Sequence, residues 1–143
     1  MSMVQPYIDD GRFEIVVEAN AYEGGAEHPL KLTEDWLLAF PEMNAIIAQH
    51  DYAIMQSVQA LIASGRDDVI TVGADAEPNA VDAILDGNLT ATVLLEPYKW
   101  GTCLIESVYK MMNGETVEKF QVITPIEINA SNAANVTNFR YVE

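Results

Sequence analysis

The stretch "NAIIAQHDYAIMQSVQALIASGRDDVITVGAD" (44–75) decides the fold, because it contains a strand, a helix and a second strand in succession. Its two apolar runs, 43–49 and 68–75, do not alternate polar and apolar residues, which is typical of strands covered on both faces. Between these runs, apolar residues recur at i, i+4, i+7 and i+8 from Ile54, and Gly65 is a helix stop signal. The spacing therefore predicts a strand–helix–strand unit.

The same alternation extends on both sides of this unit. We expect the following elements: a strand at 12–21, a loop at 22–29, helices at 30–40, 78–87 and 97–114, strands at 89–95 and 119–128, and a loosely held tail from 129. Strands that alternate with helices call for right-handed crossovers and a parallel sheet. The predicted fold is a single α/β lobe over 1–143, with a Rossmann-like parallel sheet flanked by helices on both faces.

The composition excludes several classes of protein. The 22 acidic residues outnumber the 7 basic ones, and a net charge of −15 argues against nucleic acid or an anionic membrane as partner. The single Cys103 excludes an internal disulfide and a cysteine-rich zinc cluster, and we expect it to be a buried bystander. The sequence has no apolar run of about 18 residues and no signal peptide, although a longer parent chain could still be exported.

In parallel α/β sheets, ligands bind beyond the carboxyl ends of the strands. The neighbouring pair His50-Asp51 lies at one such end, where Asp51 is expected to cap its own helix. No second histidine or cysteine has metal-ligand spacing with His50, so no metal or cofactor is predicted. Asp75 ends the next strand and has two open interpretations: a carboxylate for a polyol, or a partner for backbone N–H groups of the following helix. No nucleophile motif accompanies these residues, so we expect no enzyme.

The series "AQHDYAIMQSVQALIASGRDDVITVGADAEPNAVDAILDGNLTATVLLEPYKWG" (48–101) resembles the carboxyl-terminal lobe of type I periplasmic sugar-binding proteins of the ribose/galactose class. The resemblance runs from about Phe13 to Asn132. It implies a non-catalytic solute receptor of an ABC transporter that closes on a sugar and passes it to a permease, in the periplasm or another extracytoplasmic compartment. The same fold also serves as the effector-binding lobe of lactose-repressor-type regulators, which is the alternative function.

The resemblance also assigns ligand-binding residues. His50 takes the place of the family's sugar-contacting asparagine, and the strand-end aspartate is kept as Asp75. The usual phenylalanine before that aspartate is Ala74, and the glutamine of the crossing strand is Leu95. The aromatic and arginine of the first loop fall near Gly24 and Ala26. Each lost contact is worth about 1–3 kcal/mol, so a weakened sugar site is expected.

The family resemblance implies two lobes of about 100–150 residues each. It identifies this chain as a truncated second lobe, with 97–128 as the segment that crosses to the other lobe. Apolar side chains in that segment, such as Leu104, Val108, Met111 and Val122, would then be uncovered and would favour association. We therefore expect a homodimer or a domain-swapped dimer, and a lobe repurposed for oligomerisation is a further alternative.

Overall fold

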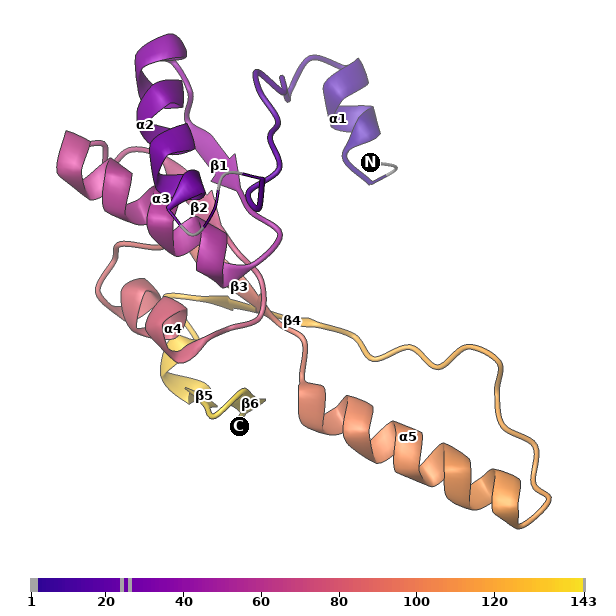
Figure 1. Cartoon of the computed structure of the whole chain (residues 1–143). Coiled ribbons are helices and arrows are strands. Elements are labelled where there is room, and N and C mark those ends of the chain that lie inside the picture. Colours follow the sequence, from indigo (N-terminus) through magenta and orange to yellow (C-terminus); the bar gives the residue numbers. More distant parts are fainter. Residues whose placement is uncertain (1–2, 24, 26, 143) are drawn as a thin grey trace.

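A computed structural model describes residues 3–23, 25 and 27–142. The helices are α1 (Gln5–Asp9), α2 (His28–Ala39), α3 (Asp51–Ser64), α4 (Pro78–Leu85), α5 (Pro97–Met112) and the 3₁₀ turn η1 (Ala133–Asn135). The strands are β1 (Ala45–Ile47), β2 (Ile70–Val72), β3 (Ala91–Leu94), β4 (Ile126–Asn129), β5 (Val136–Thr137) and β6 (Arg140–Tyr141). Figure 1 shows the helices α2, α3 and α4 gathered beside the sheet.

The predicted α/β fold with a mostly parallel sheet flanked by helices is confirmed. The strand order is β1-β2-β3-β4, with β1 parallel to β2 and β2 parallel to β3. The expectation that every strand is parallel is wrong for β4, which pairs antiparallel to β3 with Leu94 opposite Ile126. The physical reason is the connection: the chain leaves the sheet after β3, runs out along α5 and returns from the opposite direction (Figure 1).

The core lies between one face of the sheet and the helices α3 and α4. Ile46, Thr71 and Thr92 point to that face and are only 6%, 2% and 0% exposed. The opposite face is open at Ile47 and Ile70, which are 74% and 54% exposed. The expectation that β1 and β2 are covered on both faces is therefore met on the α3/α4 side only, because side chains of successive strand residues point to opposite faces.

One predicted strand, at 12–21, is absent, and the other, at 119–128, forms only from Ile126 onward, as β4. Residues 12–20 are irregular and 119–124 include no strand, and Phe13, Ile15 and Val122 are at least 48% exposed. A β-branched or aromatic run favours a strand only where a neighbouring strand can take up its backbone hydrogen bonds. Neither segment pairs with a strand of the sheet, so the local propensity is not realised.

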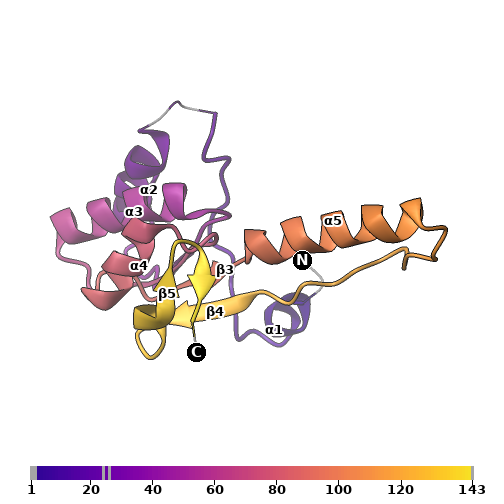
Figure 2. The same ribbon diagram turned by 90° about the horizontal axis from the view of Figure 1, so that it is seen from below.

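An arm, defined as residues 97–125, projects from the lobe. It consists of α5 and the irregular segment that returns beside it, and Figures 1 and 2 show both extending away from the sheet. No residue of α5 is buried. Cys103 is half-buried within this arm and does not belong to the core of the lobe, which corrects the expectation of a buried bystander.

The tail from residue 129 is not loosely held as expected. η1, β5 and β6 follow β4, and Ala133 is completely buried. Phe139 and Tyr141 pack against the core, and the guanidinium of Arg140 lies 3.8 Å from the centre of the Tyr98 ring. The tail therefore completes the core and contacts the first turn of α5.

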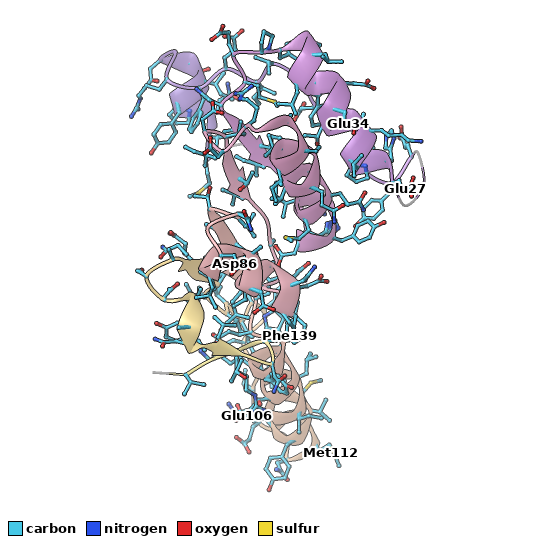
Figure 3. All side chains as sticks on the ribbon, turned by 90° about the vertical axis from the view of Figure 1, so that its left-hand side faces the viewer. Glu27, Glu34, Asp86, Glu106, Met112 and Phe139 are labelled. Carbon is cyan, nitrogen blue, oxygen red and sulfur yellow. The ribbon has the colours of Figure 1, made fainter. Side chains whose placement is uncertain are left out.

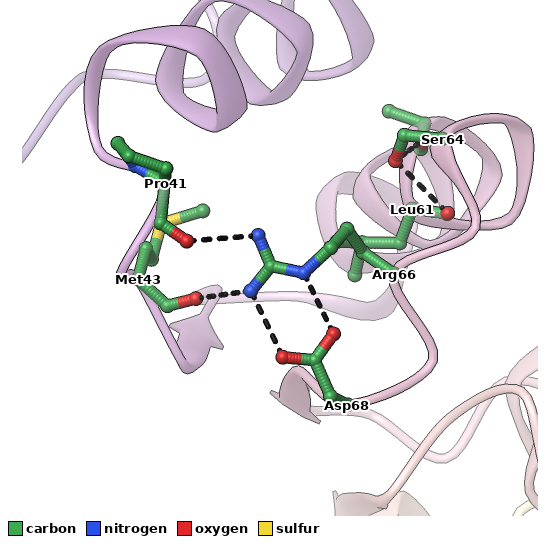
Figure 4. A network of polar contacts seen from close by, with 7 residues as sticks. Pro41, Met43, Leu61, Ser64, Arg66 and Asp68 are labelled. Atoms are coloured by element: carbon green, nitrogen blue, oxygen red, sulfur yellow. Dashed lines mark hydrogen bonds and ion pairs between the residues drawn. The ribbon is translucent and has the colours of Figure 1, made fainter.

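Arg66 joins the segments that enter β1 and β2. Its guanidinium donates hydrogen bonds to the carbonyls of Pro41 (3.1 Å) and Met43 (2.8 Å) and to the carboxylate of Asp68 (2.6 and 3.0 Å), as Figure 4 shows. The hydrogen bond from Arg66 holds the pKa of Asp68 below its ordinary value. This contact fixes the two strands at the end opposite to the candidate site.

Candidate ligand site at the strand ends

Main-chain hydrogen bonds draw the carboxyl ends of three strands together. The N–H of Asp51, just after β1, donates to the carbonyl of Ala74 at 2.7 Å. The N–H of Asp75, just after β2, donates to the carbonyl of Val93 in β3 at 2.8 Å. The three strand ends singled out in the sequence therefore form one continuous edge.

The carboxylate of Asp51 holds this edge together from inside. It is fully buried, its Oδ1 accepts from the Thr92 hydroxyl at 2.7 Å, and its Oδ2 accepts from the N–H of Glu77 at 2.8 Å. The expectation that Asp51 caps its own helix is wrong: His50 is the N-cap residue of α3, and the Asp51 side chain instead serves the start of α4. Gly73 leaves the room for it, since a Cβ there would collide with the Asp51 carboxylate.

Burial raises the pKa of the Asp51 carboxyl above its ordinary value, while the hydrogen bonds from Thr92 and Glu77 lower it; the charges of Asp75 and Glu77 raise it further. The net direction is upward because removing a carboxylate from water disfavours the charged form. Asp51 is thus a structural group, whose carboxylate joins the end of β1 to Thr92 in β3 and to the start of α4.

The backbone of this edge has an uncommon conformation. Asp75, Ala76 and Glu96 have φ angles of 109°, 54° and 50°, which residues other than glycine rarely adopt. Strained backbone of this kind gathers at ligand clamps and active sites, where the surrounding structure holds it in place. The strain marks the same edge that the topology marks as a ligand site.

Asp75 itself is half-buried at this edge. Of its two interpretations, the bond to the following helix is not observed: the N–H of Glu77 at the start of α4 is taken by Asp51. Within the described residues, no hydrogen bond to the Asp75 carboxylate is present. Its oxygens are therefore available to a ligand.

His50 lies beside a cavity of about 350 Å³ at the end of β1. The cavity is bounded by the loop 19–22, α2, the end of β1 and α3. The Tyr22 hydroxyl is 3.3 Å from Nδ1 of His50, and the two rings meet edge to face with their centres 5.2 Å apart. Gln49 and Trp36 also line the cavity, so it offers both polar groups and aromatic surface.

The structure brings only some of the predicted site residues together. His50 lines the cavity, while Ala74, Asp75 and Leu95 are half-buried at the neighbouring strand ends and do not line it. Gly24 and Ala26 lie outside the described residues. Tyr22 was missed by the sequence analysis; an aromatic two residues before Gly24, where the resemblance expects one, was the available signal.

Other kinds of site find no support in the described part of the chain. No three His, Cys, Asp or Glu side chains in it are placed to hold a metal ion. Nor does it contain a helix both long enough and apolar enough to cross a bilayer.

Residues 4–116 match the family model of the periplasmic binding protein domain. The chain belongs to the periplasmic binding protein family. This periplasmic binding protein chain is 34% identical over 89 residues to the ribose import binding protein of Escherichia coli, a match over 62% of this chain and 30% of that protein. It is 33% identical over 111 residues to a putative rhizopine-binding protein of Rhizobium meliloti, over 76% of this chain and 35% of the relative.

Solved structures agree with this assignment. A solute-binding protein from Bacillus halodurans with bound myo-inositol has a TM-score of 0.77 and 29% identity, covering 91% of this chain and 45% of that one. A solute-binding protein from Actinobacillus succinogenes with bound D-allose has a TM-score of 0.82 and 23% identity, covering 93% of this chain and 47% of that one. This likeness shows that the two proteins share a fold. The chain thus spans between about a third and a half of the proteins it resembles.

Proposed function

We propose that this periplasmic binding protein chain supplies a sugar-binding edge of an ABC transporter solute receptor. The observation that carries the proposal is the strained strand-end edge, where the Asp75 carboxylate is available and the ring of His50 lies at the next strand end. The names of the relatives support it, since they include ribose import and D-xylose-binding proteins.

The chemistry of the edge suits a polyol. A carboxylate accepts hydrogen bonds from two neighbouring hydroxyls, and bonds to a charged group are worth about 1.5–3 kcal/mol. The His50 ring can donate or accept a further bond, and the edge-to-face contact with Tyr22 holds it in position. Asp75 would bind a diol of the sugar, and His50 a third hydroxyl.

The same proposal covers partners and location. A receptor of this family would act outside the cytoplasm, deliver its sugar to a membrane permease and catalyse no reaction. The reported relatives are import and periplasmic binding proteins. These names do not favour the alternative, the effector-binding lobe of a transcription regulator.

A thermal-shift panel of pentoses, hexoses and inositols tests the proposal. For a Kd of about 1 mM, a sugar at about 10 mM stabilises the protein by about 1.4 kcal/mol, a shift of a few degrees. Asp75→Asn is expected to abolish the shift, whereas the matched change Asp82→Asn, at an exposed position of α4, leaves it intact. A flat response to every polyol, or an equal shift in Asp75→Asn, would contradict the proposal.

A further inference from the structure

The turn between β2 and α4 has a conformation that its own residues do not favour. Asp75 and Ala76, in the middle of this turn, have φ angles of 109° and 54°. Residues with a Cβ rarely adopt such angles, and they keep them only where the surrounding structure holds the backbone in place. The same turn carries the carboxylate of the proposed sugar site. The groups that hold the turn therefore decide how Asp75 meets a ligand.

Main-chain hydrogen bonds fix the first half of the turn. The N–H of Asp51 donates to the carbonyl of Ala74 at 2.7 Å, and the N–H of Asp75 donates to the carbonyl of Val93 at 2.8 Å. These two bonds tie the turn to the strand ends on either side. They do not reach the second half, which leads into α4.

Two buried side chains, Asp51 and Thr92, hold the second half of the turn. The N–H of Glu77 donates to Oδ2 of Asp51 at 2.8 Å, and the N–H of Ala76 donates to the hydroxyl oxygen of Thr92 at 3.4 Å. The Thr92 hydroxyl in turn donates to Oδ1 of Asp51 at 2.7 Å. Both residues are completely buried, so water does not compete for these bonds. We call these three hydrogen bonds the Asp51 clamp.

The clamp needs two acceptor oxygens at position 51. A carboxylate accepts on both of its oxygens, whereas an asparagine side chain has one acceptor oxygen and a donor NH₂ group. The Thr92 hydroxyl has a single proton and gives it to Asp51, so its oxygen is left to accept from the N–H of Ala76. Loss of either side-chain group would release an N–H of the turn, and the strained backbone could then relax.

The clamp lies entirely within the lobe. Asp51 begins α3, Thr92 lies in β3, and Glu77 is the N-cap residue of α4. The arm contributes no residue to it, and Figure 3 shows the end of the arm, at Met112, away from the lobe. None of the three bonds uses the carboxylate of Asp75. The clamp therefore fixes the backbone of the turn and leaves that carboxylate to a ligand.

We propose that Asp51 and Thr92 are positioning residues of the sugar site: the Asp51 clamp holds the turn 74–77 in the conformation that presents the Asp75 carboxylate to the sugar. This inference rests on the proposed function, in which Asp75 binds the sugar. A carboxylate that accepts from two hydroxyls must have its oxygens correctly directed, because hydrogen bonds weaken steeply with misalignment. A turn that is ordered before binding also avoids the cost of ordering it during binding.

The first test of the clamp needs no sugar. Thr92→Val removes the hydroxyl and Thr92→Ser keeps it; the matched control Thr71→Val removes another buried hydroxyl of the sheet, which accepts from the N–H of Thr90 at 3.1 Å. A positive φ brings the amide and α protons of one residue close together, so the NOE between them is strong. Asp75 and Ala76 should show strong intraresidue NOEs in the parent protein, in Thr92→Ser and in Thr71→Val, and weak ones in Thr92→Val.

The second test is calorimetric titration with D-ribose, D-allose and myo-inositol. For the sugar that the parent protein binds best, Thr92→Val should weaken binding at least about tenfold. Thr92→Ser should recover most of that loss, and Thr71→Val should keep the parent affinity, although both variants lose stability. Asp51→Asn keeps the size of the side chain and loses one acceptor, so it should repeat the effects of Thr92→Val on the NOEs and on affinity. It also serves in place of Thr92→Val if that variant does not fold.

Two results would overturn the proposal. Strong NOEs at Asp75 and Ala76 in both Thr92→Val and Asp51→Asn would show that the turn keeps its conformation without the clamp. An equal loss of affinity in Thr92→Ser and Thr92→Val would show that stability alone is responsible. A parent protein that binds none of the three sugars would contradict the proposed function itself, and the NOEs would still decide whether the clamp holds the turn.

Discussion

Replacing Thr92 by Val removes the hydroxyl that donates to Oδ1 of Asp51 at 2.7 Å and keeps the shape of the side chain. Both residues are completely buried, so no water replaces the lost donor. A buried charged acceptor that loses its partner costs about 1–3 kcal/mol. For a chain of this length, that lowers Tm by roughly 3–10 °C.

The pH dependence of this loss follows from the raised pKa of Asp51. A carboxyl whose pKa is higher in the folded than in the unfolded protein favours folding below the unfolded pKa, and this contribution is lost as pH rises through the folded pKa. The Thr92 hydrogen bond lowers the pKa of Asp51, so Thr92→Val raises it further. The stability deficit of the variant should therefore be largest at pH 7 and shrink toward pH 4.

Urea unfolding of both proteins at pH 7, 5.5 and 4.5 measures that deficit. Taking the difference between variant and parent at each pH cancels the other carboxylates. Thr124→Val, at an exposed position in the arm, serves as the control and should change stability by less than about 0.5 kcal/mol. A Thr92→Val deficit below about 0.5 kcal/mol at pH 7, or one that grows as pH falls, would refute the reasoning.

Gly73→Ala should cost about 1–3 kcal/mol in urea unfolding, because the new Cβ overlaps the Asp51 carboxylate; parent-like stability would contradict this. Arg66→Lys should lower Tm, because lysine cannot contact two carbonyls and a carboxylate at once. In an NMR titration of this variant, the pKa of Asp68 should rise toward its ordinary value. An unchanged titration would count against the contact. His50→Asn, which restores the residue type that the family resemblance expects, should strengthen sugar binding in calorimetry, and weaker binding would contradict that assignment.

The strand–helix–strand unit could be predicted from the sequence because its signals are local. The helical spacing from Ile54 predicts α3, and Gly65 ends it in the left-handed conformation with φ 68°. Likewise, proline at the start and glycine after the end bracket α4. The observed strands are shorter than predicted, because an apolar run continues beyond the residues that pair with a neighbour.

The failures concern interactions between distant residues. Asp51 is of a residue type that often caps helices, and it stands where a helix begins. Its partner Thr92, however, is 41 residues away, and no local pattern predicts that contact. The β-branched run at 15–17 favours a strand, yet the sheet places no strand beside it. In the tail, Phe139 packs on the core although the flanking sequence is polar.

The candidate site was predictable in its location more than in its detail. The order of strands and helices leads to the strand-end edge that contains His50 and Asp75. The contact between Tyr22 and His50 was not predictable, since it joins a loop to a strand end 28 residues later.

The central claim is that a sugar binds at the strand-end edge, and backbone amide NMR during a sugar titration tests it most directly. On adding D-ribose, D-allose or myo-inositol, saturable shifts should concentrate at 48–51, 73–76 and 95–96, and Asp75→Asn should abolish them. Amide resonances that stay unchanged with all three, or shifts centred on the arm, would contradict the claim.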